Sequence, residues 1–347
     1  MRYFLRKIFY SILVLVGVVT LVFIMFQGFG DPARLIVGQT GDKKTMENIR
    51  KDLHLDQSKW KQFVLYLNDV SPLSFYSKEE IDEKKLEGIF IGGRINFAIK
   101  YPYLGRSYQT KKEVSAVLMD ALPGTLVLAF AAMLFACIAG IFLGVIAAIK
   151  RNTWVGHTAI FGSIAGISAP SFFMAILIAY LFGIVLHPYT GLNLTGSLFE
   201  IDEVTGEKFL NLKNLILPAF TLGIRPLAII MQLTRSAMLD VMGQDYIRTA
   251  YAKGLNKNTV IIHHALRNAL NPVITAITGW FAELLAGAFF IEYIFGWKGI
   301  GKVTVDALEK LDYPVVMGAV LLSACIFIFI NILADILYKK IDPRIKV

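Results

Sequence analysis

Residues 240–271, DVMGQDYIRTAYAKGLNKNTVIIHHALRNALN, form the longest polar and basic interruption in the apolar second half of the chain. Within this stretch, Tyr246–Lys253 contains neither Gly nor Pro and consists mostly of residues that tolerate a helix. Gly254 follows and is expected to end this helix, because glycine accepts backbone conformations that other residues avoid. A second short helix is expected to run through the His-His pair, capped by the side chain of Asn256 or Asn258. The stretch is therefore predicted to be two short ordered helices joined at a glycine.

The chain around this stretch has the composition of a membrane protein. It has 347 residues, of which 56% are hydrophobic, and its mean hydropathy is +0.59. Such values exceed those of a soluble protein with a large core. The first apolar run is longer than the about 7 to 15 residues of a signal-peptide core, and no A-x-A site follows, so we expect an uncleaved helix. Six membrane spans are predicted, at about residues 8–28, 125–149, 159–186, 215–238, 272–291 and 315–338.

The basic residues of the short loops and tails indicate the orientation. They gather on one side of the six segments, which is then the cytoplasmic side, while the acidic loop 187–211 falls outside. The net charge of +9 is attributed to these residues and to lipid headgroups, not to nucleic acid. The residues are Arg2, Arg6, Lys7, Lys150, Arg151, Arg235, Arg248, Lys253, Lys257, Arg267, Lys339, Lys340, Arg344 and Lys346.

The predicted fold is an all-α polytopic membrane protein with six transmembrane helices and both termini in the cytoplasm. Residues 1–30 hold the first helix. Residues 31–120 form an extracellular insertion between helices 1 and 2, expected to contain a small folded piece with one or two helices. Residues 121–347 form a five-helix core, with cytoplasmic helices at about 240–267.

Small residues recur at helical spacing along the second segment. Such a face lets two helices approach closely in lipid. The third segment contains a Gly162-x-x-x-Gly166 pattern and an internal Pro170. The small residues of the second segment are Ala129, Ala132, Ala136, Gly140, Gly144 and Ala148.

Two ionisable residues, Arg225 and Glu283, fall at similar depth in the fourth and fifth segments. Each lies roughly 20 Å from the cytoplasmic end of its helix. A lone charge at the middle of a bilayer costs at least about 2.5 kcal/mol. We expect both side chains to face the interior of the helix bundle and to interact as an intramembrane polar pair. The alternative is that each one snorkels or lines water separately.

No catalytic, cofactor or metal site is predicted in this chain. Residues 296–302, GWKGIGK, fit the first part of a P-loop, but Val303 stands where the Mg²⁺-binding Ser or Thr is required, and no strand precedes them. We expect a tight turn there and no ATP site. His263 and His264 would point about 100° apart on a helix, which disfavours a shared metal ion.

Residues 245–255, DYIRTAYAKGL, and residues 264–272, HALRNALNP, together resemble the coupling loop of ABC-importer permeases, specifically of the dipeptide/oligopeptide/nickel permease family. The general motif of such importers is E-A-A-x3-G-x9-I-x-L-P. Here RTA replaces E-A-A, Gly254 is kept, and HALR replaces I-x-L-P, as in the peptide subgroup. The outer region at about residues 71–100 is longer than the corresponding region usually is in this family. Further matches are GDP at 30–32, LGRS at 104–107, LPGT at 122–125, SAPSF at 168–172, EYIFGWKGIG at 292–301 and DYP at 312–314.

The resemblance implies a multi-pass permease subunit of the bacterial cell membrane, surrounded by lipid, without enzymatic activity of its own. A second homologous permease would form the other half of the pathway. Two cytoplasmic ATPase subunits would bind ATP and Mg, and an extracellular substrate-binding (lipo)protein would deliver the substrate. Residues 246, 250 and 253 share one helix face by their spacing, with residues 245 and 248 as a polar rim. The residues implied to contact the ATPase are Asp245, Tyr246, Arg248, Thr249, Ala250, Lys253, Gly254 and Leu255.

The substrate implied first is a dipeptide or oligopeptide, while nickel or metal chelates, glutathione and oligosaccharides are carried by related permeases. Two other classes of membrane protein would require different sequence features. A stand-alone secondary transporter would work without an ATPase, and no internal repeat is seen that would favour it. A membrane enzyme would need a reactive cluster at matched depth, and only Arg225 and Glu283 are found.

Overall fold

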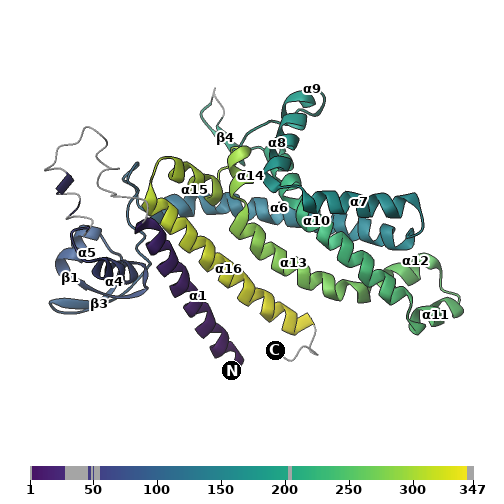
Figure 1. Cartoon of the computed structure of the whole chain (residues 1–347), viewed down its shortest axis with the longest axis horizontal. Coiled ribbons are helices and arrows are strands. Elements are labelled where there is room, and N and C mark those ends of the chain that lie inside the picture. The colour runs from purple at the N-terminus through teal and green to yellow at the C-terminus, as the bar shows by residue number, and fades with distance from the viewer. Residues whose placement is uncertain (1, 28–45, 48–49, 51–54, 202–204, 342–347) are drawn as a thin grey trace. The chain divides into compact units, whose positions relative to one another are not determined.

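The computed structural model describes residues 2–27, 46, 47, 50, 55–201 and 205–341. The GDP stretch at 30–32 and the tail beyond residue 341 lie outside this part of the chain. The structure is mostly helical (Figure 1) and divides into two compact units. The first unit comprises Met1–Asp120 and Val303–Cys325, and the second comprises Ala121–Lys302 and Ile326–Val347.

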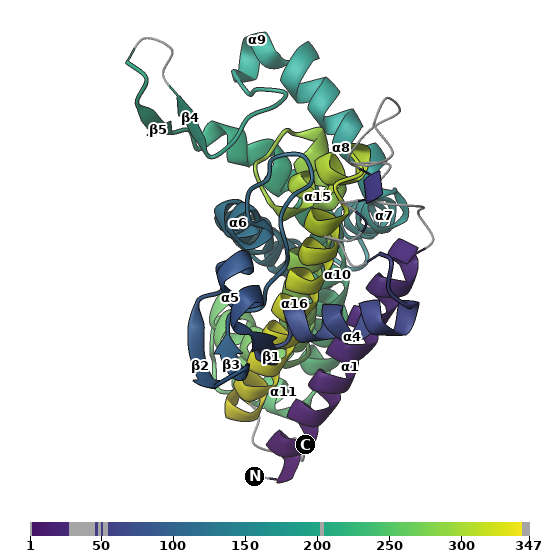
Figure 2. The same cartoon turned by 90° about the vertical axis from the view of Figure 1, so that its left-hand side faces the viewer.

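The first unit begins with the apolar helix α1 (Arg2–Gln27), against which α4 (Lys59–Val70) packs (Figure 2). The rings of Phe23 and Phe63 lie 5.2 Å apart between their centroids. The amide of Gln27 donates to the side-chain oxygen of Gln62 over 3.0 Å. Within the 31–120 region, α4 therefore packs on the first helix.

A three-stranded antiparallel sheet follows α4, in the order β1-β3-β2. Its strands are β1 (Leu73–Ser77), β2 (Gly88–Gly92) and β3 (Ile95–Lys100), and α5 (Lys78–Lys84) connects β1 to β2. Tyr76 and Ala98 lie on one face of the sheet, and both are buried. The helices α4 and α5 match the sequence prediction of a small folded piece with one or two helices, whereas the sheet was not predicted. Its opposite face exposes Leu73, Phe75, Ile89, Ile91, Ile95 and Ile99.

Asp312, which immediately precedes α16 (Tyr313–Ile341), is buried and fixes the loop that contains the LGRS stretch. Its carboxylate accepts the Tyr108 amide at 2.8 Å and the Ser107 hydroxyl. The LGRS and DYP stretches, about 200 residues apart in sequence, thus form one hydrogen-bonded joint.

The second unit is organised around α10 (Lys213–Met242), which packs against α7 (Trp154–Ser168), α8 (Ser171–Tyr180) and α13 (Arg267–Gly287) (Figure 1). The long α6 (Val114–Ile149) enters this unit from the first. The remaining elements are a π-helical turn η1 (Leu181–Val185), α9 (His187–Thr190), β4 (Phe199–Ile201), β5 (Lys208–Leu210), α11 (Asp245–Ala252), α12 (Lys257–Thr259), a π-helical stretch η2 (Val260–Leu266), α14 (Phe289–Ile294) and α15 (Ile300–Glu309).

The small-residue face of α6 packs against α10, which confirms the predicted close helix contact and identifies its partner. A Cβ added at Gly144 would lie 2.6 Å from the Cβ of Thr234 and 2.7 Å from the Met231 carbonyl oxygen. In the other direction, a Cβ at Gly223 of α10 would lie 2.8 Å from the Ala132 carbonyl oxygen of α6. The two backbones therefore approach so closely at these positions that only glycine fits without a shift of the neighbouring atoms.

Four described helices are long and apolar enough to cross a membrane: Arg6–Gln27, Val114–Ile149, Lys213–Met242 and Tyr313–Ile336. A bent pair, Trp154–Ser168 with Ser171–Val185, makes a fifth if it counts as one span. The two halves meet at 108°, next to Pro170, which starts α8 as its N-cap. The predicted fifth segment lies on α13 and α14, which are not among these apolar spans, so the total of six spans stays a prediction.

Candidate functional site

The helix α11 and the joint that follows it form an exposed surface at the end of α10. Gln244 precedes the helix in an extended conformation, and Asp245 supplies an acidic residue to its first turn. Asp245 and Arg248 pair at 3.6 Å, but their side chains are 96% and 79% exposed. Such an exposed pair adds little stability. The exposed residues from the predicted contact set are Asp245, Tyr246, Arg248, Thr249, Lys253, Gly254 and Leu255.

Ala250 does not share this exposed face, contrary to the prediction from helical spacing. It is 6% exposed and packs with Ile247 into a core cluster that includes Ala148 of α6 and Met238 of α10. The turn after α10 directs the Ile247–Ala250 strip inward, and spacing along the helix alone did not reveal this direction. Ala250 therefore anchors α11 to its own chain and leaves Tyr246 and Lys253 on the surface.

Gly254 ends α11 in the left-handed region, with φ +81°, as the sequence predicted. Its amide donates to the Tyr251 carbonyl oxygen at 2.9 Å. An added Cβ would meet no atom within 4 Å. The requirement for glycine is thus one of backbone conformation and not of space.

The second helix begins where the sequence indicated but does not end there. Asn256, one of the two predicted caps, accepts the Thr259 amide at 2.8 Å. The helix then continues through η2 into α13, so that α12, η2 and α13 form one uninterrupted helical segment from Lys257 to Gly287. The prediction of a separate short helix ending at His264 is wrong, because the chain accommodates this stretch as a π-helix instead of breaking.

One hydrogen bond, from Asn268 to Tyr246, fastens α11 to this continuous segment. The Asn268 amide donates to the hydroxyl of Tyr246 at 3.0 Å and to the His264 carbonyl oxygen at 3.0 Å. His263 is exposed. Within the described ranges, no group of three or more His, Cys, Asp or Glu side chains is placed to hold a metal ion.

The P-loop-like residues 296–302 form a turn whose amides are already used by the protein. The carboxylate of Glu292, a fully buried side chain, accepts the Gly301 amide at 2.7 Å and the Lys302 amide at 3.2 Å. The Thr125 hydroxyl donates to the same carboxylate at 2.7 Å. Burial raises the pKa of Glu292 to about 7, although these hydrogen bonds oppose the shift. The amides that a P-loop would offer to a phosphate are therefore not available here.

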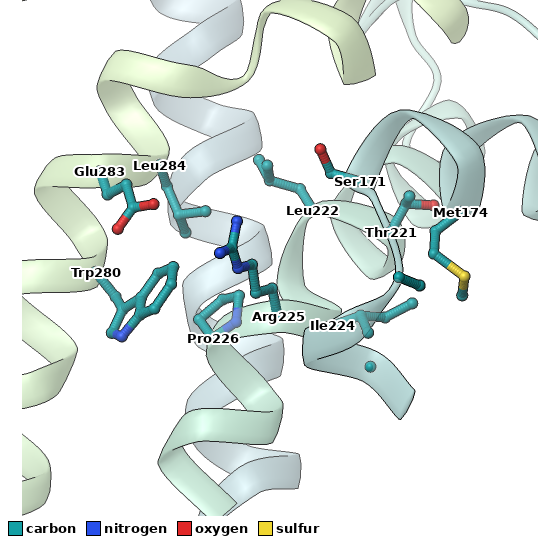
Figure 3. Close-up of a pocket in the computed structure, with 12 residues that line it drawn as sticks. Ser171, Met174, Thr221, Leu222, Ile224, Arg225, Pro226, Trp280, Glu283 and Leu284 are labelled. Carbon is teal, nitrogen blue, oxygen red and sulfur yellow. The ribbon is translucent and has the colours of Figure 1, made fainter. Parts of the chain in front are cut away.

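Arg225 and Glu283 line one pocket of about 100 Å³ inside the second unit (Figure 3). The Arg225 guanidinium lies over the Trp280 ring, 5.7 Å from its centroid. The structure shows no ion pair between Arg225 and Glu283 across its described residues, and their pairing stays a prediction. The sequence did not single out Trp280, although its position one helical turn before Glu283 places both on the same face of α13.

Comparisons with known proteins cover the whole length of the chain. Residues 140–347 match the family described as "Binding-protein-dependent transport system inner membrane component", and residues 1–80 match the N-terminal part described for such membrane components. A dipeptide transport system permease protein DppB of Alkalihalophilus pseudofirmus is 33% identical over 100% of this chain and 99% of its own length. DppB of Haemophilus influenzae is 44% identical over 70% of this chain and 76% of its own length.

Another relative has a different named substrate. The glutathione transport system permease protein GsiC of Escherichia coli is 32% identical over 91% of this chain and 89% of its own length. An inward-facing structure of the MetNI methionine ABC transporter has a TM-score of 0.52 and 17% identity, over 66% of this chain and 97% of that one, and shows a shared fold. The chain belongs to the family of inner membrane components of binding-protein-dependent transport systems.

Proposed function

We propose that this protein is the permease subunit of an ABC importer and forms half of a translocation pathway for dipeptides or oligopeptides. The names of the DppB relatives support a peptide substrate. The GsiC relative supports glutathione, itself a small peptide, as the alternative within the same type of complex. Nickel or other metal chelates are a third option, which rests on the family resemblance alone.

The proposed topology has six spans, with both termini in the cytoplasm and residues 31–120 outside, in the bacterial cytoplasmic membrane. The bent pair α7–α8 counts as the third span. The helix α13, with 21 residues, is about 31 Å long and reaches across a hydrocarbon core of about 30 Å. Its polar residues, including Glu283, fit a helix that faces the pathway and not lipid.

We propose that α11 and the Gly254 joint are the contact through which two partner ATPase subunits drive this chain. The observation that carries the proposal is that α11 exposes one surface to solvent while Ile247 and Ala250, on its other side, are buried in its own chain. Ile247 and Ala250 fix the helix to α6 and α10, so a force on Tyr246 or Lys253 moves the helix as a rigid element. ATP and Mg would be bound by the ATPases, whose closure would displace α11 and turn the pathway outward. A second permease and an extracellular binding protein complete the complex.

Affinity purification of the tagged protein from its own membranes tests the complex, and uptake into proteoliposomes tests the substrate. The tagged chain should bring down a second permease and ATPase subunits. ATP-dependent uptake should occur for peptides of two to several residues. Uptake without any ATPase would support a secondary transporter instead. Uptake confined to glutathione or to nickel would replace peptides with that substrate.

A further inference from the structure

The pocket that contains Arg225 and Glu283 is built at a break between two helices. Its wall includes Ala169 and Ser171, on either side of the Pro170 N-cap at which α7 and α8 meet. Figure 3 shows the Arg225 side chain extending between Trp280 and Glu283 of α13 and the residues Ser171 and Met174 of α8. Three helical elements therefore direct polar groups at one small space.

The two charges in this pocket are opposite in sign and unsatisfied. Both side chains are exposed to the pocket, although Arg225 lies in the middle of a membrane-spanning helix. Apart from the contact of Arg225 with the Trp280 ring, neither side chain has a hydrogen bond or an ion pair to the described residues. Ionised groups at this depth are kept where they meet a partner, a ligand or water. Such a separated cation and anion match a ligand that carries both charges.

The helix break adds a second anion-attracting feature beside Arg225. Pro170 caps α8 without a side-chain hydrogen bond, so the first amides of α8 lack a capping group from the N-cap residue. The start of an interrupted membrane helix attracts negative charge through these amides and the helix dipole. The carboxylate of a ligand would thus meet Arg225 and the Ser171 end of α8, while its ammonium group would meet Glu283 and the face of Trp280.

We propose that this pocket binds the terminal ammonium and carboxylate groups of a short zwitterionic peptide during its passage, and this assignment rests on the proposed transport function. A chain spans at most about 3.3–3.6 Å per residue, so an extended peptide has both ends within one small pocket only when it has two or three residues. The volume of about 100 Å³ is well below the roughly 300 Å³ of small-molecule sites. The pocket thus recognises the ends of the peptide and leaves its side chains to the open pathway.

The test is equilibrium binding of radiolabelled Ala-Ala to the permease–ATPase complex in nanodiscs without the binding protein. Arg225→Met and Glu283→Gln remove one charge each. Lys213→Met, which removes a cation from the same helix outside the pocket, is the matched control. We expect either pocket variant to weaken Ala-Ala binding by about tenfold to a hundredfold, as for loss of a charged hydrogen bond, and the control to leave it unchanged.

Peptides with blocked ends assign each charge to one terminus. N-acetyl-Ala-Ala, which lacks the ammonium group, should bind equally to the wild-type protein and to Glu283→Gln. Ala-Ala-amide, which lacks the carboxylate, should bind equally to the wild-type protein and to Arg225→Met. This pattern is specific to a zwitterion site, because a merely structural role of either residue would weaken all three peptides alike.

Equal losses for blocked and unblocked peptides, unchanged binding in both variants, or no binding by the wild-type complex would each overturn the assignment. Size-exclusion profiles and co-purification of the ATPases establish that the variants assemble. Uptake by the complete complex with its binding protein is measured in parallel. Peptide uptake without this binding pattern overturns the pocket alone, whereas the absence of ATP-dependent peptide uptake overturns the proposed function.

Discussion

Gly254 offers the sharpest test of the proposed coupling, because a matched glycine exists elsewhere in the same unit. Gly254 has φ +81° and Gly191, at the end of α9, has φ +62°. A Cβ added at either position meets no atom within 4 Å. The substitutions Gly254→Val and Gly191→Val therefore impose the same kind of backbone strain without a steric clash.

The strain amounts to about 1–3 kcal/mol for a non-glycine residue held in this conformation. The chain relieves it by changing the backbone at the joint. At Gly191 the change is confined to the end of a four-residue helix. At Gly254 it alters the angle between α11 and α12, and a free-energy shift of this size changes the population of the coupled geometry by about 5- to 150-fold.

The assay is peptide uptake per ATP hydrolysed in proteoliposomes that contain the complete complex. We expect Gly254→Val to lower this ratio by at least about fivefold, at the lower limit of that range, while the ATPases still co-purify. Gly191→Val should also lower the stability of the protein by about 1–3 kcal/mol, but it should leave the ratio of peptide uptake to ATP hydrolysis at the wild-type value. Equal ratios in the two variants would refute the assignment of α11 and its joint to coupling, since strain would then act only on stability.

Three further predictions concern packing and protonation. Gly144→Leu should destabilise the protein by about 1–3 kcal/mol in a thermal unfolding assay, because its Cβ would collide with the backbone of α10. Gly162→Leu should leave the stability unchanged, because a Cβ at Gly162 has no other atom within 4 Å. Ala250→Leu should destabilise the packing of α11 by about 1–3 kcal/mol, because Ala250 is buried, and should make α11 more sensitive to limited proteolysis. Ala252→Leu, at an exposed position of the same helix, should leave the proteolysis rate unchanged. Burial raises the pKa of Glu292 from 4.5 to about 7, so the folded protein holds this proton more tightly than the unfolded chain does. The free energy of unfolding should therefore fall by about 3 kcal/mol as the pH rises from about 4.5 to about 7. Glu292→Gln should remove this component in melting curves taken across that range, and an unchanged pH profile would contradict it.

Local chemistry in the sequence was enough to predict some elements of this fold. The small residues of α6 indicated a close helix contact, and Gly254 and Asn256 have the backbone conformation and the capping role that their chemistry predicts. These features depend on one helix or one turn at a time. The proposed assembly rests on the family resemblance, because no periodicity within one chain reveals its partners.

Other features depend on long-range packing and could not be predicted. The burial of Ala250 follows from the angle between α10 and α11, and the sheet of the 31–120 region follows from pairing between short strands. The Asp312 joint brings together residues about 200 positions apart. In each case the contact depends on how separate elements pack or pair, and the local signal is only one residue or one alternating run of five or six residues.

The continuous segment from Lys257 to Gly287 links the two candidate sites physically. The helix α11 is attached at one end to α10, which carries Arg225, and at the other end to the segment that carries Trp280 and Glu283. Apart from residues 243–244 and 253–256, which join α11 to its neighbours, both routes from α11 to the pocket are helical, over about 26 Å of α10 and about 39 Å of the other segment. A displacement of α11 therefore acts on both walls of the pocket and changes the separation of its two charges, unless η2 or Pro226 absorbs it. A peptide that bridges Arg225 and Glu283 would oppose that change. By the reciprocity of linked equilibria, its binding should then change the affinity of the complex for ATP by the same factor by which ATP changes the affinity for the peptide.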